Sequence, residues 1–155
     1  MSAVTCSPDD NLTYAEEVKL AACMHQLYTT GEVALAIGNP WYQNYVDYSK
    51  ANKIIDKDNE WDAPATRAGY IEIFAGVLPD EAYNEINNIK AGSIPDVPDS
   101  HASAAAIYKL YRAGIVQGVN DEHYCDPSSY IKRAEVAAII NRMIDETARI
   151  EFTII

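Results

Sequence analysis

The amino-acid sequence predicts an all-α protein built from repeated helix–loop–helix units. Three observations support this prediction. A helix-start pattern occurs three times, the stretch after each start has the apolar spacing of a helix, and no segment alternates as a β-strand does. The chain has 155 residues, 48% of them hydrophobic, which is enough to bury a core.

Two of the three helix starts align without gaps, and the third is a shorter copy. Residues 6–17 (CSPDDNLTYAEE) match residues 125–136 (CDPSSYIKRAEV), and a shorter copy lies at 61–70 (WDAPATRAGY). Each copy departs from the others at a different position, and together they imply the unit Thr-Arg-Ala-Glu. A threonine followed three residues later by a glutamate is a capping box. The box is complete only at Thr13 and Glu16.

The segments after the three starts share one apolar face. When they are aligned on Ala15, Ala68 and Ala134, apolar side chains recur at the spacing that makes a buried helical stripe. His25 falls on this face and is interpreted as a core or boundary histidine, since no metal-ligating residues accompany it. The shared positions hold Leu20, Ile73 and Ile139; Met24, Val77 and Met143; and Ala21, Phe74 and Ile140.

A preceding helix is predicted at residues 41–55 and again at 101–116, and a short bridging helix at 79–89. The predicted organisation follows from these elements. It comprises the second half of a first repeat (1–37), a second repeat (38–92), a third repeat (93–148) and a C-terminal tail (149–155).

The net charge is −11, which argues against a nucleic-acid backbone or an anionic membrane as partner. No apolar run approaches the length of a membrane span, and the first residues lack the pattern of a secretory signal. Because the chain begins inside the repeated pattern, we expect a fragment of a larger exported protein.

The sequence predicts neither a metal site nor a cofactor. Cys6, Cys23 and Cys125 fit no zinc-ligand spacing and are expected as buried thiols, with a bridge from Cys6 to either of the others left open. The acidic stretch 56–62 (DKDNEWD) alternates like a calcium loop, but a tryptophan stands where the loop needs glycine.

Arginine in the first turn of a helix opposes the helix macrodipole, and Arg67 and Arg133 both stand there. One interpretation is that each guanidinium holds a carboxylate or phosphate from outside the chain, beside the amides of the helix start. The alternative is a salt bridge to one of the chain's many carboxylates. The sequence leaves both open.

Residues 114–143 (GIVQGVNDEHYCDPSSYIKRAEVAAIINRM) resemble the S-layer homology (SLH) motif, and residues 94–100 (IPDVPDS) resemble the Asp-Val segment that precedes it. The resemblance implies a pseudo-threefold helical bundle with grooves between repeats. It also implies a non-catalytic, extracellular module at the bacterial cell surface, associated with peptidoglycan. Such modules bind secondary cell-wall polysaccharide, often through pyruvylated N-acetylmannosamine.

Carried over by position, the resemblance implies eight ligand-binding residues. Two arginines would hold the ligand carboxylate, a threonine and a glutamate would order the helix start, two glycines would let the loop approach the sugar, and two tryptophans are candidate platforms. For the glycines the alternative is a helix cap and a turn, and for the tryptophans a place in the core. These residues are Arg67, Arg133, Thr66, Glu135, Gly114, Gly118, Trp41 and Trp61.

The first two starts depart from the family pattern. Tyr14 stands where the arginine is expected, and Gly69 stands where the glutamate is expected. These departures favour an alternative function, a degenerate SLH module that mediates protein–protein assembly, including self-association, at the cell surface. An enzyme is not predicted, because no catalytic constellation is anchored by a motif.

Overall fold

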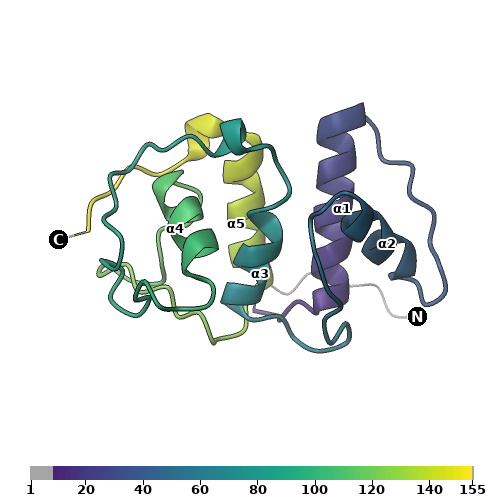
Figure 1. Ribbon diagram of the computed structural model, residues 1–155, viewed down its shortest axis with the longest axis horizontal. Coiled ribbons are helices and arrows are strands. Elements are labelled where there is room, and N and C mark those ends of the chain that lie inside the picture. The colour runs from purple at the N-terminus through teal and green to yellow at the C-terminus, as the bar shows by residue number, and fades with distance from the viewer. Residues whose placement is uncertain (1–8, 155) are drawn as a thin grey trace.

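The computed structural model describes residues 9–154. Within this range the protein is helical, as predicted, and contains no β-sheet. Figure 1 shows α1 and α2 at one end of the molecule, α4 at the other, and α3 and α5 between them. The α-helices are α1 (Tyr14–Thr30), α2 (Gln43–Ala51), α3 (Arg67–Phe74), α4 (Ala104–Arg112) and α5 (Arg133–Ile144), and the 3-10 turns are η1 (Asp80–Tyr83) and η2 (Glu146–Ala148).

Short extended segments precede α1, α3 and α5, and they are hydrogen-bonded to one another in a closed ring. We call this arrangement the start ring. Each segment pairs with the other two, so the three repeated helix starts lie together although they are far apart in the sequence. The pseudo-threefold arrangement of whole repeats stays a prediction. The ring contains three isolated bridges, Asn11 with Lys132, Thr13 with Pro64 and Thr66 with Tyr130.

Two helix pairs that follow one another in the sequence pack together: α2 packs on α1, and α4 packs on α3. The α1–α2 contact buries a small cluster of Val18, Ala22, Tyr45 and Val46. The larger core lies around α3 and α4, where the fully buried side chains include Tyr70, Phe74, Ile107, Leu110 and Tyr111.

The predicted apolar face of the second helices is confirmed over most of its length. Ile73, Val77, Ile139 and Met143 are all buried. The face ends before Ile144, which is 70% exposed, because α5 terminates there and no described segment covers it.

The predicted bridging helix at 79–89 is wrong beyond its first turn. Only Asp80–Tyr83 is helical, as the 3-10 turn η1. The amides of Ile86 and Asn87 instead donate to the carbonyl of Arg112 at the end of α4. A tertiary hydrogen-bond acceptor therefore replaces the helical one.

The two preceding helices are shorter than the predicted ranges 41–55 and 101–116. Both end in the same way, with a residue in the left-handed conformation followed by an isoleucine amide that donates back to the last turn. In α4 the left-handed residue is Gly114 (φ 75°), and in α2 it is Lys53 (φ 59°).

The cysteines that the structure describes are both free thiols. Cys125 is buried and Cys23 is partly buried. Burial raises the pKa of Cys125 to about 11, so this thiol stays protonated at neutral pH. Cys6 lies outside the described residues.

Candidate functional site: the junctions between helix starts

Two junctions of the start ring contain an arginine–glutamate ion pair. Arg67 at the start of α3 pairs with Glu135 in the first turn of α5. Arg133 at the start of α5 pairs with Glu16 in the first turn of α1, with 2.7 Å between Nη2 and Oε2. Each arginine of the repeated pattern therefore meets the glutamate of the next helix start.

Arg67 is the more buried of the two arginines. It is 4% exposed, and its Nε donates to the carbonyl of Cys125 at 2.7 Å. That carbonyl is itself fixed, because the amides of Cys125 and Asp126 donate to the Asp96 carboxylate at 2.9 and 2.7 Å. Burial lowers the pKa of Arg67 from its usual value, and the opposing charges nearby offset only part of this effect. The Asp-Val segment thus has a structural use in supporting Arg67.

The third junction has no ion pair. Its two equivalent positions are Tyr14 and Gly69, and these residues touch. A Cβ added to Gly69 would lie 2.4 Å from the Tyr14 hydroxyl oxygen. That hydroxyl also lies 3.4 Å from Oγ1 of Thr66. The two departures from the repeated pattern are therefore in contact with one another.

Backbone amides at the starts of α1 and α3 already have partners within the protein. The amides of Tyr14 and Ala15 donate to carbonyls of residues 63 and 61, and those of Arg67 and Ala68 donate to carbonyls of residues 129 and 127. Later amides of the same first turns donate to side chains: the Glu16 amide donates to the Thr13 hydroxyl, and the Gly69 amide donates to the Thr66 hydroxyl. A ligand at these starts would thus depend on side chains for its hydrogen bonds.

The capping roles expected of Thr66 and Glu135 are visible in the hydrogen bonds. Thr66 Oγ1 accepts from the Gly69 amide at 3.0 Å, and Glu135 Oε1 accepts from the Lys132 amide at 3.1 Å. The complete capping box at Thr13 and Glu16 is confirmed.

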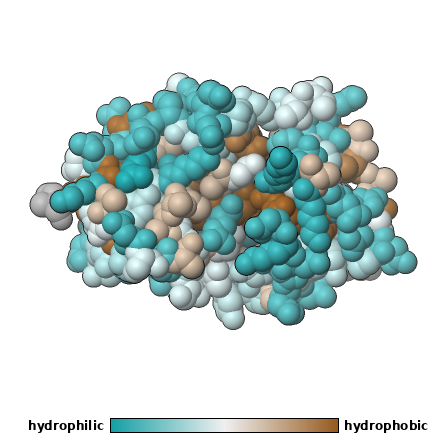
Figure 2. Space-filling view, viewed as in Figure 1, coloured by the Kyte–Doolittle hydropathy of each residue, from teal (hydrophilic) through white to brown (hydrophobic). Residues whose placement is uncertain are grey.

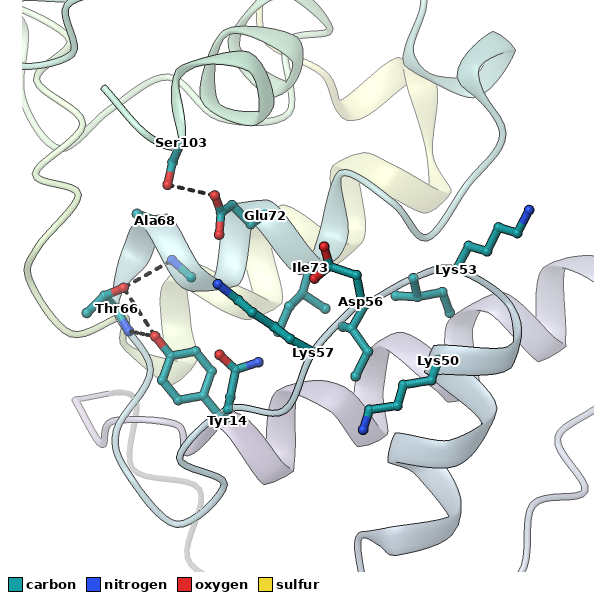
Figure 3. A pocket seen from close by; sticks show the side chains of 14 residues that line it. Tyr14, Lys50, Lys53, Asp56, Lys57, Thr66, Ala68, Glu72, Ile73 and Ser103 are labelled. Atoms are coloured by element: carbon teal, nitrogen blue, oxygen red, sulfur yellow. Dashed lines mark hydrogen bonds between the residues drawn. The ribbon is translucent and has the colours of Figure 1, made fainter. Parts of the chain in front are cut away.

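A groove of about 900 Å³ opens beside the junction of Tyr14 and Gly69. One wall is the first turn of α3, and the other is the loop that follows α2. Figure 3 shows Lys57 reaching across the groove toward the start of α3, with Tyr14 at the near end and Lys50 entering from α2. We call it the lysine groove. Its charged lining residues are Lys50, Lys53, Lys57, Asp56 and Glu72.

Two carboxylates line this groove, Asp56 and Glu72, and Asp58 lies beside it on Lys50. Glu72 accepts from the Ser103 hydroxyl at 2.9 Å, and Lys50 pairs with Asp58 at 2.8 Å. Among residues 9–154, Lys53 and Lys57 make no ion pair. The groove is thus lined by both lysines and carboxylates, and Lys57 is the cation that extends across it.

Lys53 occupies a backbone conformation that disfavours side chains. Its φ is 59°, and the equivalent position at the end of α4 is Gly114. The Ile54 amide donates to the Ser49 carbonyl, as the Ile115 amide donates to the Leu110 carbonyl. A lysine therefore stands at the edge of the groove where α4 is followed by a glycine, and Figure 3 shows its side chain directed away from the start of α3.

The two predicted glycines have clear structural uses. A Cβ on Gly114 would lie 2.8 Å from the Ile150 carbonyl oxygen, and one on Gly118 would lie 2.7 Å from the Tyr124 carbonyl oxygen. Both have positive φ. The structure thus supports the cap and turn interpretations, while loop approach to a sugar stays a prediction.

The two tryptophans lie beside α2 in an aromatic group with Tyr42 and Tyr45. Trp41 is 40% exposed and meets both tyrosine rings edge-on, with Lys19 Nζ 5.9 Å from its ring centre. Trp61 is partly buried against Tyr42. Neither lines the lysine groove.

Two smaller clefts adjoin Arg67, of about 300 and 650 Å³. Gly118 and Glu135 line the first, and Tyr130 and Glu135 line the second. Since Arg67 and Arg133 each have an internal carboxylate partner, a ligand carboxylate would compete with that partner. The ligand-holding role of both arginines stays a prediction.

Sequence reasoning missed the lysines of the groove. The available signal was the clustering of three lysines within residues 50–57 of an acidic chain. Within residues 9–154 there is no group of three potential metal ligands, and no helix there is long and apolar enough to span a membrane.

Comparison with known proteins finds a family match in part of the chain. Residues 93–137 match the model of the S-layer homology domain family. A protein described as "Cell surface protein", from Thermoanaerobacter kivui, is 30% identical over 83 residues, which is 54% of this chain. The match spans 11% of the length of that relative. The resemblance seen in the sequence is thereby confirmed.

Proposed function

We propose that this chain, whose residues 93–137 match the S-layer homology domain, binds an acidic secondary cell-wall polysaccharide in the lysine groove. The domain implies a cell-surface anchoring module in general, associated with cell-wall polymers. The finer proposal concerns the ligand, a pyruvylated amino sugar, and the place where it binds.

The lysine groove is the observation that carries the proposal. Its volume of about 900 Å³ falls within the range of pockets that hold small ligands. Both of its walls come from the predicted second repeat, Tyr14 and Ser103 border it from the other two, and Lys57 extends into it. Polar groups that converge in a cleft of this size fit a short segment of sugar chain.

Charge supports an anionic ligand. Lys57 extends across the groove and has no ion-pair partner among the described residues, so a ligand carboxylate would displace water from it rather than another carboxylate. A pyruvate ketal carries one carboxylate on a sugar ring, which matches a groove with a few cations and with hydroxyl and amide groups at Ser103 and Asn59.

The direct test is a titration of the protein with purified wall polysaccharide, before and after chemical removal of pyruvate. We expect binding to the intact polymer that weakens with added salt, and loss of most of it after depyruvylation. Equal binding to both polymers would exclude the pyruvate as the recognised group.

A second candidate function is the assembly of protein chains, which is favoured by an apolar surface at the C-terminal ends of α1 and α5. A cavity of about 230 Å³ lies there, and Leu27, Tyr28 and Ile144 around it are 50%, 57% and 70% exposed. Figure 2 shows apolar side chains in the hollow between the α1–α2 end and the central helices. Sedimentation of the protein and of Leu27→Ser/Ile144→Ser tests this candidate, since self-association through this surface predicts a dimer that the variant lacks.

A further inference from the structure

The two residues that break the repeated pattern occupy one junction. Elsewhere in the start ring, Arg67 meets Glu135 and Arg133 meets Glu16. In the remaining junction the arginine position is Tyr14 and the glutamate position is Gly69. The phenol fills the space that a side chain at position 69 would need, since its oxygen lies 2.4 Å from the position of the missing Cβ.

The two departures, Tyr14 and Gly69, are structurally dependent on one another. An arginine at position 14 opposite a glycine would lack the carboxylate that its counterparts have. Any side chain at position 69 would collide with the Tyr14 hydroxyl, which is held near Thr66 Oγ1 and the Thr66 amide at 3.4 and 3.5 Å. At this junction, therefore, the Tyr14 ring packs directly against the backbone of Gly69, where the other junctions have an ion pair.

This exchange changes the lysine groove, because Tyr14 and Gly69 both line it. With no glutamate at position 69, the carboxylate that α3 adds to the wall toward which Lys57 extends is Glu72, which accepts from the Ser103 hydroxyl. The phenol adds an amphipathic ring of the kind that contacts the apolar face of a sugar. The other two junctions hold a glutamate in the equivalent place.

We propose that Tyr14 and Gly69 form one coupled specificity element, which gives the lysine groove an aromatic wall and leaves Lys57 free to bind the carboxylate of a carboxylated sugar. This inference rests on the proposed function and names the residues that set its specificity. It assigns the ligand to the junction without an ion pair rather than to the two junctions that have one.

The coupling itself is tested without a ligand, by melting temperatures. Gly69→Ala should lower the melting temperature, because the added methyl group collides with the phenol. In the Tyr14→Ala background, the same Gly69→Ala change should have little further effect. Additive effects of the two substitutions would contradict the coupling.

The specificity is tested by calorimetric titration with the methyl glycoside of pyruvylated N-acetylmannosamine. The variant Tyr14→Arg/Gly69→Glu restores the residues of the other junctions, and we expect it to lower affinity by about tenfold or more, because an internal ion pair like those of the other junctions then stands where the aromatic ring lined the groove. Tyr14→Leu removes the ring without adding charge and should also weaken binding, which keeps the test valid if the double variant does not fold.

Tyr124→Leu is the matched control, since Tyr124 is an exposed tyrosine outside the groove. Wild-type affinity in Tyr14→Leu, or in a folded Tyr14→Arg/Gly69→Glu variant, would overturn the inference and leave the proposed function intact. No binding of the sugar by the wild-type protein would overturn both. Free pyruvate that binds as tightly as the sugar would contradict a role for the aromatic wall.

Discussion

At the scale of single residues, the most unusual group is the carboxyl of Glu17. It is fully buried in α1, and neither oxygen has a hydrogen-bond partner among the described residues. Burial, with a smaller contribution from Glu16, raises its pKa from 4.5 to about 9. Tyr70 of α3 is also buried, with its pKa raised by burial and then by Glu17. Glu17 is therefore a neutral acid in the folded protein at neutral pH.

This predicts a stability that falls as pH rises. The folded protein holds the Glu17 proton up to about pH 9, whereas the unfolded chain releases it near 4.5. The contribution to stability is therefore complete below the lower value and is lost between the two, with a slope of at most about 1.4 kcal/mol per pH unit. Denaturant unfolding across this range should show a flatter profile for Glu17→Gln than for the wild type.

The comparison of the two profiles isolates Glu17, because the glutamine keeps the shape of the side chain and cannot ionise. Parallel pH profiles for the two proteins would mean that Glu17 is ionised in the folded state, or that water reaches it.

At the scale of elements, the junctions between helix starts differ in burial. The side chain of Arg67 is 5% exposed and that of its partner Glu135 is 32% exposed, whereas Arg133 and Glu16 are 29% and 32% exposed. A buried guanidinium whose partners are a carboxylate and a carbonyl holds two elements together. A pair open to water contributes much less.

We therefore expect Arg67→Ala to lower the free energy of unfolding by about 3 kcal/mol, because it leaves Glu135 and the Cys125 carbonyl without their donor. Arg133→Ala, the matched control in the same ring, should cost below about 1 kcal/mol. Chemical denaturation of both variants measures the difference. Small and equal decreases in the free energy of unfolding would mean that Arg67 does not stabilise the contact between the helix starts, and would strengthen its predicted role as a ligand contact.

The loop after α2 shows a second feature at the element scale, since Lys53 is held at φ 59° where α4 uses Gly114. The left-handed conformation costs a side-chain-bearing residue about 1 kcal/mol relative to glycine. Lys53→Gly should therefore stabilise the protein by about 1 kcal/mol in thermal unfolding. It should also weaken polysaccharide binding if the lysine serves the groove. A loss of stability would show that Lys53 makes contacts worth more than the strain.

At the scale of the whole molecule, the helical fold and the three helix starts could be predicted from the sequence, because apolar spacing and capping residues act within one turn. The chemistry of the site could not. Whether Arg67 faces a ligand or Glu135 depends on how segments nearly seventy positions apart meet in the start ring.

The lysine groove illustrates the same limit. Lys57 comes from a loop that follows the left-handed turn at Lys53, Lys50 comes from the end of α2, and the facing wall comes from α3. Tyr14 and Gly69 were visible as departures from the pattern, but their contact is a property of packing. Local signals predict elements, and tertiary contacts decide which side chains face a cleft.

Binding of wall polysaccharide by Lys50→Ala/Lys57→Ala tests the central claim most directly, with Lys90→Ala as the control because Lys90 is exposed and outside the groove. We expect the groove variant to lose affinity by about tenfold or more at low ionic strength, and Lys90→Ala to bind as the wild type does. Equal affinities of all three proteins, with unchanged helicity and melting temperature, would contradict the assignment of the ligand to the lysine groove.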